Sequence, residues 1–156
     1  MIIDSNLVFD PAGTSPWAVG TIVSTNVLDM VNARDMGIGE DLKVSVIPSG
    51  TWAGGGTMQV QLQSAPDNGS GSPGTWTIAA ETDAFTAADL NSPTFQHVSM
   101  IGFDLPERRA GAAVPRFYRL AYVIATSNFT AGTLQSFVNL ARDQNTLYPS
   151  GFSVPN

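Results

Sequence analysis

Seven consecutive residues near the middle of the chain, Met58 to Ser64, alternate between two kinds of side chain. The apolar residues of this segment are Met58, Val60 and Leu62, and the residues between them are glutamines. Successive side chains of a strand point to opposite faces of a sheet, so this period of two predicts a half-buried antiparallel strand. The segment therefore constrains the chain to a sheet with one face in the core.

Less strict runs of the same kind recur along the chain and bring the expected total to roughly eight strands. In Phe117 to Ala125, one face carries Tyr118, Leu120, Tyr122 and Ile124, and the other carries Arg119, Ala121 and Val123. This pattern predicts a central strand. The expected strands are Leu7 to Asp10, Gly20 to Val27, Leu42 to Ile47, Met58 to Ser64, Thr75 to Ala80, His97 to Leu105, Phe117 to Thr126 and Thr133 to Leu140.

Turn-forming residues separate these runs, since the chain holds 15 glycines and 10 prolines. Long Gly/Pro-rich loops are expected at Pro48 to Gly56, Pro66 to Gly74 and Pro106 to Gly111. A helix of one or two turns is expected at Thr86 to Leu90, with Thr86 as its N-cap.

The pattern predicts an all-β, single-domain, jelly-roll-like antiparallel β-sandwich over residues 1–156. Both ends carry apolar or aromatic side chains where chain termini are normally polar. We therefore expect an N-terminal arm at residues 1–10 and a C-terminal arm at residues 147–156. Each arm is expected to pack on its own sandwich or on a neighbouring subunit.

The charge and cysteine content narrow the range of functions. The chain has 7 basic and 13 acidic side chains, a net charge of −6 and no cysteine. An acidic surface repels phosphates, so neither nucleic acid nor an anionic membrane is expected as a partner. The lack of cysteine excludes disulfides, thiolate zinc sites and cysteine nucleophiles.

The N-terminus lacks the basic and apolar pattern of a signal peptide, and no apolar stretch approaches the length of a membrane span. The sequence therefore predicts a soluble protein made in the cytoplasm.

Catalysis is not expected. The sole histidine, His97, can share a strand face with Ser99, but the chain has no Gly-x-Ser-x-Gly elbow. Its acidic residues are scattered and show no calcium-loop spacing, so no metal site or cofactor is expected.

A protein-contact role is the more informative hypothesis. Trp52 falls in a predicted loop, where a large ring must pack on its own domain or on a partner. Arg108 and Arg109 form a doubled basic site on an acidic chain and could meet a carboxylate-rich neighbour. The candidate interface residues are Ile2, Ile3, Trp52, Arg108, Arg109, Tyr148 and Phe152.

Several segments together resemble the capsid cement proteins of tailed bacteriophages, from the first residue almost to the last. They are Met1 to Ser5 with Leu7 to Phe9, Ala33 to Glu40, Val60 to Gln63, Phe117 to Val123, Ala131 to Thr133 and Tyr148 to Phe152. The resemblance implies a jelly-roll protein on the outside of the phage head, made in the host cytoplasm, with no catalytic residues. It also implies two partners, the major capsid protein and other copies of this chain, with a dimer favoured over a trimer.

Two other classes of function remain as alternatives. A carbohydrate-binding module would use Trp52 or Trp76 as an exposed stacking platform. A small hydrolase would need His97 to meet a serine and a carboxylate in a pocket.

Overall fold

The computed structural model describes residues 7–11, 17–30, 42–92, 103–105 and 115–140. This part of the chain forms nine strands and one short helix. In chain order they are β1 (Val8–Asp10), β2 (Gly20–Val23), β3 (Leu28–Asp29), β4 (Leu42–Gly54), β5 (Thr57–Ala65), β6 (Thr77–Thr86), α1 (Ala87–Leu90), β7 (Phe103–Leu105), β8 (Phe117–Ala125) and β9 (Phe129–Leu140).

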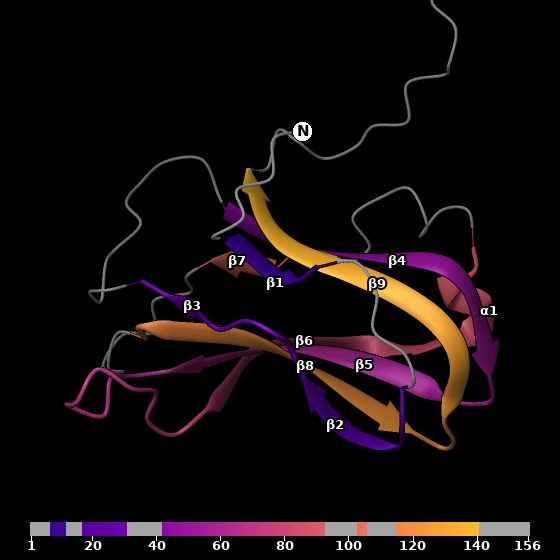
Figure 1. Cartoon of the computed structure of the whole chain (residues 1–156), viewed down its shortest axis with the longest axis horizontal. Coiled ribbons are helices and arrows are strands. Elements are labelled where there is room, and N and C mark those ends of the chain that lie inside the picture. Colours follow the sequence, from indigo (N-terminus) through magenta and orange to yellow (C-terminus); the bar gives the residue numbers. More distant parts are fainter. Residues whose placement is uncertain (1–6, 12–16, 31–41, 93–102, 106–114, 141–156) are drawn as a thin grey trace, which may run out of the picture.

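The strands form two antiparallel sheets that face each other (Figure 1). One sheet has the order β1-β9-β4-β7, and the other has the order β2-β8-β5-β6, with β3 also paired to β8. The pairs are nested: β1 joins β9, β2 and β3 join β8, β4 joins β7, and β5 joins β6. This nesting across two sheets is the jelly-roll arrangement that the sequence predicts.

The alternation in β5 is confirmed. Met58, Val60 and Leu62 are buried in the core between the sheets, whereas the three glutamines between them lie half-buried on the outer face. The glutamines are half-buried because β5 is an interior strand with β8 on one side and β6 on the other.

The central position of β8 is confirmed as well. It pairs with β5 along its whole length, and on its other side with β2 and then β3. Tyr118, Leu120, Tyr122 and Ile124 all belong to the buried core cluster.

The predicted helix forms with its predicted cap. The Thr86 hydroxyl accepts a hydrogen bond from the Asp89 amide, and the Asp89 carboxylate accepts one from the Thr86 amide. This reciprocal capping box satisfies amide donors at the start of the helix. Leu90 then points into the core and is fully buried.

The segment Pro48 to Gly56 is not the loop that its composition predicts. Its residues as far as Gly54 extend β4, because β9 continues beside them as a hydrogen-bonded partner. The register shifts between Ser49 and Ala53, and Gly50 takes up the extra length in a left-handed conformation with φ of 70°.

Two other strand boundaries differ from the prediction. The expected strand Gly20 to Val27 is two strands, β2 and β3, because the residues between them turn away to bond with β1. At the other edge of the same sheet, β6 begins at Thr77 and runs on to the helix cap at Thr86.

Glycine is required where the chain passes between the sheets at the end of β4. A Cβ atom on Gly54 would lie 2.5 Å from the Asn128 carbonyl oxygen, and one on Gly56 would lie 2.3 Å from that of Ser127. Residues 127–128 form the second crossing, from β8 to β9, so the two crossings press directly on each other. The Gly54–Gly56 run is therefore a packing requirement.

We expect Val60→Asp to prevent folding. The substitution would place an unpaired carboxylate in the core at a cost of several kcal/mol, against a total stability of about 5–15 kcal/mol for a typical domain. Circular dichroism and thermal melting measure the loss. Gln63→Asp is the matched control, because it adds the same charge to the outer face of β5 beside Arg119. A folded Val60→Asp with an unchanged melting temperature would contradict the register.

Candidate functional site

Most of the predicted contact residues lie outside the described part of the chain. This group comprises Ile2, Ile3, Arg108, Arg109, Tyr148 and Phe152. His97, the histidine considered for catalysis, also lies outside the described residues. Their roles stay predictions. Trp52 is the member of the set that the structure describes.

Trp52 lies in the core, with 2% of its surface exposed. Its ring packs edge-on against Phe129, with centroids 5.3 Å apart, and at a tilt against Trp17, with centroids 5.7 Å apart. This position corrects the expectation that Trp52 offers a surface to a partner. The residue looks like a loop residue in the sequence only because prolines and glycines surround it.

The position of Trp52 is fixed by Gly132 and Asn91. A Cβ atom on Gly132 would lie 2.3 Å from the indole, so only glycine leaves room for the ring. The Asn91 side chain accepts a bond from the Trp52 amide at 2.7 Å and donates one to its carbonyl oxygen at 2.8 Å. Asn91, the C-cap residue of α1, thus satisfies the backbone amide and carbonyl of Trp52 at the bulge of β4.

A second buried cluster surrounds Asp10, which is 3% exposed. Its carboxylate accepts hydrogen bonds from the Tyr122 hydroxyl at 2.6 Å and the Ser136 hydroxyl at 2.9 Å. The other carboxylate oxygen accepts from the amide and hydroxyl of Thr25. Burial, and next the charge of Asp10, raises the pKa of Tyr122 well above its usual value.

The Asp10 cluster brings an acid and two hydroxyls together, but it is closed to solvent. Tyr122 is 1% exposed and Ser136 is fully buried, so no substrate can reach them. Its role is to tie the sheets together, because Asp10 and Ser136 come from one sheet and Tyr122 from the other. No sequence pattern predicts this cluster, because its members lie far apart in the chain.

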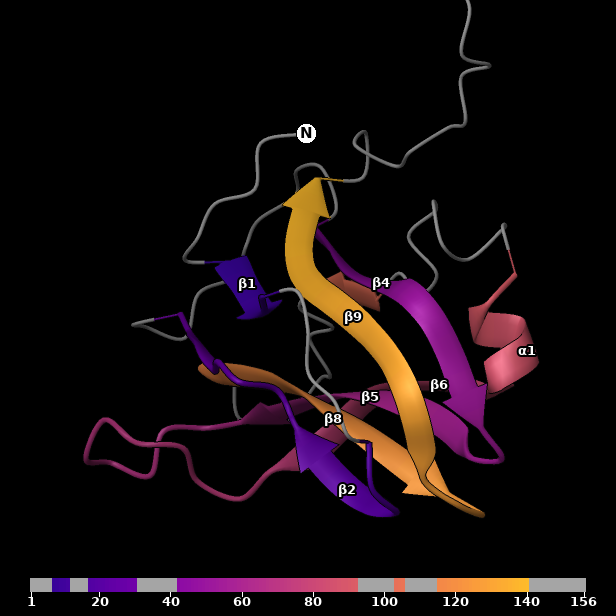
Figure 2. The same cartoon turned by 45° about the vertical axis from the view of Figure 1, so that its right-hand side comes forward.

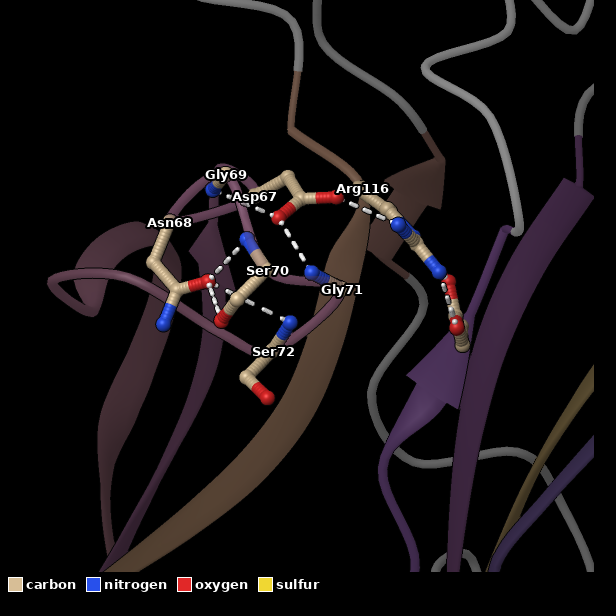
Figure 3. Close-up of polar contacts among 8 residues, drawn as sticks. Asp67, Asn68, Gly69, Ser70, Gly71, Ser72 and Arg116 are labelled. Carbon is tan, nitrogen blue, oxygen red and sulfur yellow. Dashed lines mark hydrogen bonds and ion pairs between the residues drawn. The ribbon is translucent and has the colours of Figure 1, made fainter.

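A salt-bridged clamp on the surface joins three distant segments (Figure 3). The Arg116 guanidinium donates two hydrogen bonds to Asp29, at 2.6 and 2.8 Å, and a third to Asp67. The Asp67 carboxylate also accepts from the amides of Gly69 and Gly71. The pKa of Asp67 is lowered most by the hydrogen bond from the Gly69 amide, and further by those from the Gly71 amide and the Arg116 side chain.

The clamp fixes the loop at residues 66–74 to the rest of the sheet. Asn68 supplies a second set of side-chain bonds within this loop, to the amides of Ser70 and Ser72 (Figure 3). A loop rich in glycine and serine thereby takes one shape. The sequence predicts the loop, but not its pairing with Arg116.

The outer face of the β2-β8-β5-β6 sheet carries a connected row of polar side chains. Arg119 lies 4.2 Å over the Trp76 ring and donates to Gln63, which donates to Gln61, which donates to Glu81. We call this row, Trp76, Arg119, Gln63, Gln61 and Glu81, the glutamine row. Its members come from β5, β6, β8 and the residue just before β6.

The same row bears on the carbohydrate-binding alternative. Trp76 is half-buried, and the Arg119 guanidinium already stacks on its ring. Trp52 is in the core. Neither Trp52 nor Trp76 therefore offers the open platform that sugar stacking needs.

Two further observations concern the described residues alone. They contain no group of three or more His, Cys, Asp or Glu side chains that could hold a metal ion. None of their helices has the length and apolar character needed to cross a membrane.

The comparison with protein families is decisive for classification. The family model of Bbp16 matches residues 16–138, which is more than three quarters of the chain. The chain belongs to the Bbp16 family. Bbp16 is a phage-associated family, and the chain is therefore classed with phage proteins. No curated protein matches the chain.

We expect Gly132→Ala to destabilise the protein more than Gly20→Ala does. Both glycines have similar φ values, 128° and 131°, but a Cβ atom meets the Trp52 indole at Gly132 and nothing within 4 Å at Gly20. Overpacking of this kind costs about 1–3 kcal/mol. Chemical denaturation measures both variants, and equal losses would show that the Trp52 contact is not tight.

We expect Asp67→Asn to lower the melting temperature at pH 7 by a small amount. Its carboxyl has a pKa below the usual 3.8, so it stabilises the fold at neutral pH and loses that contribution as the pH falls through the folded-state pKa. The difference from the wild type should therefore vanish in acid. Asp83→Asn removes one exposed charge elsewhere and serves as the control. A difference that persists at low pH would exclude the clamp as its source.

Proposed function

We propose that this protein is a capsid cement protein, which binds the outside of a phage head and stabilises contacts between major capsid protein subunits. Membership of a phage-associated family over most of the chain is the observation that carries the proposal. The resemblance of the sequence to cement proteins agrees with it. The Asp10 cluster, which combines an acid with two hydroxyls, is sealed in the core, which favours a structural role for it over an enzymatic one.

Residues 8–10 of the predicted N-terminal arm are the strand β1 of the sandwich, while the predicted C-terminal arm, residues 147–156, lies outside the described residues. Val8 pairs with Phe137, so the chain enters β1 beside the last residues of β9 (Figure 1). Residues 1–6 precede β1 and residues 141–156 follow β9.

The root of the N-terminal arm is held firmly. β1 is hydrogen-bonded to β9, and Asp10 at its end is bonded to Tyr122 in the opposite sheet. A force applied to this arm is therefore transmitted to both sheets of the sandwich.

The mechanism is stabilisation by mass action. A protein that binds only the assembled shell favours that shell by RT ln(1 + [L]/Kd), which is about 4 kcal/mol per site at a thousandfold excess over Kd. Repeated over many sites, contacts of modest strength raise the force and temperature that the head withstands. The place of action is the outer surface of the virion, after synthesis in the host cytoplasm.

We expect the protein to co-sediment with purified undecorated heads at a fixed ratio to the major capsid protein. Removal of residues 147–156, or of residues 1–6, should abolish or weaken binding while the melting temperature stays near that of the full chain. Trp76→Ala is the matched control, because it removes an aromatic side chain from the glutamine row and leaves both arms intact.

Failure of the full chain to bind heads would overturn the cement proposal. Normal binding by both truncated forms would instead exclude the arms as the attachment. Loss of binding in Trp76→Ala alone would move the contact to the glutamine row.

A further inference from the structure

The loop at residues 66–74, at one edge of the sandwich (Figure 2), contains a chemically reactive pair, Asn68 followed by Gly69. The side-chain amide of an asparagine can be attacked by the backbone nitrogen of the next residue. Glycine hinders this attack least, because it has no side chain. Of the asparagines in the chain, Asn68 is the one that glycine follows. It is exposed to solvent, so water can reach the reacting groups.

The reaction of such a pair is deamidation, which needs no reagent other than water. The Gly69 nitrogen loses its proton and forms a bond to the side-chain carbonyl carbon of Asn68. The side-chain amide group leaves as ammonia and takes up that proton, so that a cyclic succinimide remains. Water then opens the ring to aspartate or isoaspartate. Both products carry a new negative charge, and isoaspartate also adds a methylene group to the main chain.

The shape of the loop depends on both members of the pair. Gly69 has φ of 91°, a conformation that residues with a Cβ atom rarely adopt. The side-chain oxygen of Asn68 accepts hydrogen bonds from the amide and hydroxyl of Ser70, at 2.9 and 2.7 Å, and from the Ser72 amide at 3.4 Å. Replacement of either residue would therefore strain or loosen the loop.

The same loop holds the attacking nitrogen away from reaction. The Gly69 amide donates a hydrogen bond of 2.8 Å to the Asp67 carboxylate (Figure 3). To attack, this nitrogen must give up that bond and develop negative charge beside a carboxylate, which repels it. The carbonyl group under attack is itself held by the bonds from Ser70 and Ser72.

Asp67 is fixed in this position and is a poor proton acceptor. Its carboxylate is ion-paired with Arg116, which is bonded in turn to Asp29. The hydrogen bond from the Gly69 amide is the largest cause of the lowered pKa of Asp67. A carboxylate with a low pKa is a weak base, so it does not remove the amide proton readily.

We propose that Asn68 is a deamidation site, and that the hydrogen bond from Gly69 to Asp67 holds the reaction back while the protein is folded. When that bond is lost, Asn68 reacts as it does in an unfolded chain. The Asp67 carboxylate thus protects the covalent structure of the loop as well as its shape.

Peptide mapping by mass spectrometry tests the proposal, because it measures aspartate and isoaspartate at residue 68 over time. The full chain is incubated at neutral pH, folded in buffer and unfolded in urea. We expect deamidation of the folded wild type to be slower than in urea by about tenfold or more, which corresponds to about 1.4 kcal/mol or more of barrier. Asp67→Ala removes the acceptor of the Gly69 bond and should bring the folded rate close to the rate in urea. Its own rate in urea should equal that of the wild type.

Two further variants identify the source of the protection. Asp83→Ala is the matched control, because it removes an exposed carboxylate from β6 and leaves the loop intact. We expect it to react like the wild type. Arg116→Gln removes the ion pair but keeps the acceptor of the Gly69 amide, so it should accelerate deamidation less than Asp67→Ala does. Circular dichroism checks that each variant is folded in buffer.

An Asn68 that stays unmodified in urea would overturn the proposal, as would a folded wild type that reacts as fast as the unfolded chain. An unchanged rate in folded Asp67→Ala would also overturn it. Equal acceleration by Arg116→Gln and Asp67→Ala would assign the protection to the ion pair and so exclude the Gly69 bond as its source. None of these measurements uses phage heads, so the deamidation proposal can fail while the cement function stands, and the reverse.

Discussion

The fit of the Trp52 ring against Gly132 holds together the end of the sandwich where the chain passes between the sheets. β4 and β9 are the longest strands of their sheet and pair with each other, and the absence of a side chain at residue 132, opposite the bulge of β4, leaves room for the Trp52 ring. The indole fills that space and contacts Phe129 and Trp17. Glycines 54 and 56 then let the two crossings between sheets touch. A larger residue at any of these glycines would push the crossings apart.

This aromatic cluster continues into the buried polar cluster through Tyr122. The Tyr122 ring packs edge-on against Trp17, with centroids 5.3 Å apart, and its hydroxyl donates to Asp10. A carboxylate in a core is costly unless its oxygens are hydrogen-bonded, and both oxygens of Asp10 are. The requirement for four specific donors also fixes how β1 lies on the sandwich, because a shifted β1 would leave a buried charge unsatisfied. Tyr122 therefore takes part in both the aromatic packing and the buried hydrogen-bond cluster.

The sequence was sufficient where the local pattern and the tertiary environment agree. β5 and β8 have one face in the core, so their alternation is visible, and the Thr86 cap is a local interaction between residues three apart. The prediction failed for Trp52, because Pro48 and the glycines around it are typical of a loop, and only the pairing with β9 makes the segment a strand. The clusters of Asp10 and Arg116 could not be predicted, since each joins residues that the fold alone brings together. Of the predicted contact residues, the structure describes Trp52 and removes it from the surface.

The edge strand β2 and the strand β1 lie at two different places along β9. β2 pairs with the last residues of β8, next to the crossing at which β9 begins, and Trp17 just before β2 is bridged to Phe129. β1 pairs instead with residues near the end of β9. Since β9 is twelve residues long, these two places lie at opposite ends of a strand roughly 40 Å long. The Trp52 ring packs on Phe129 at the first end of β9, and Ser136 near the other end bonds to Asp10, so both ends of this strand are tied into the core.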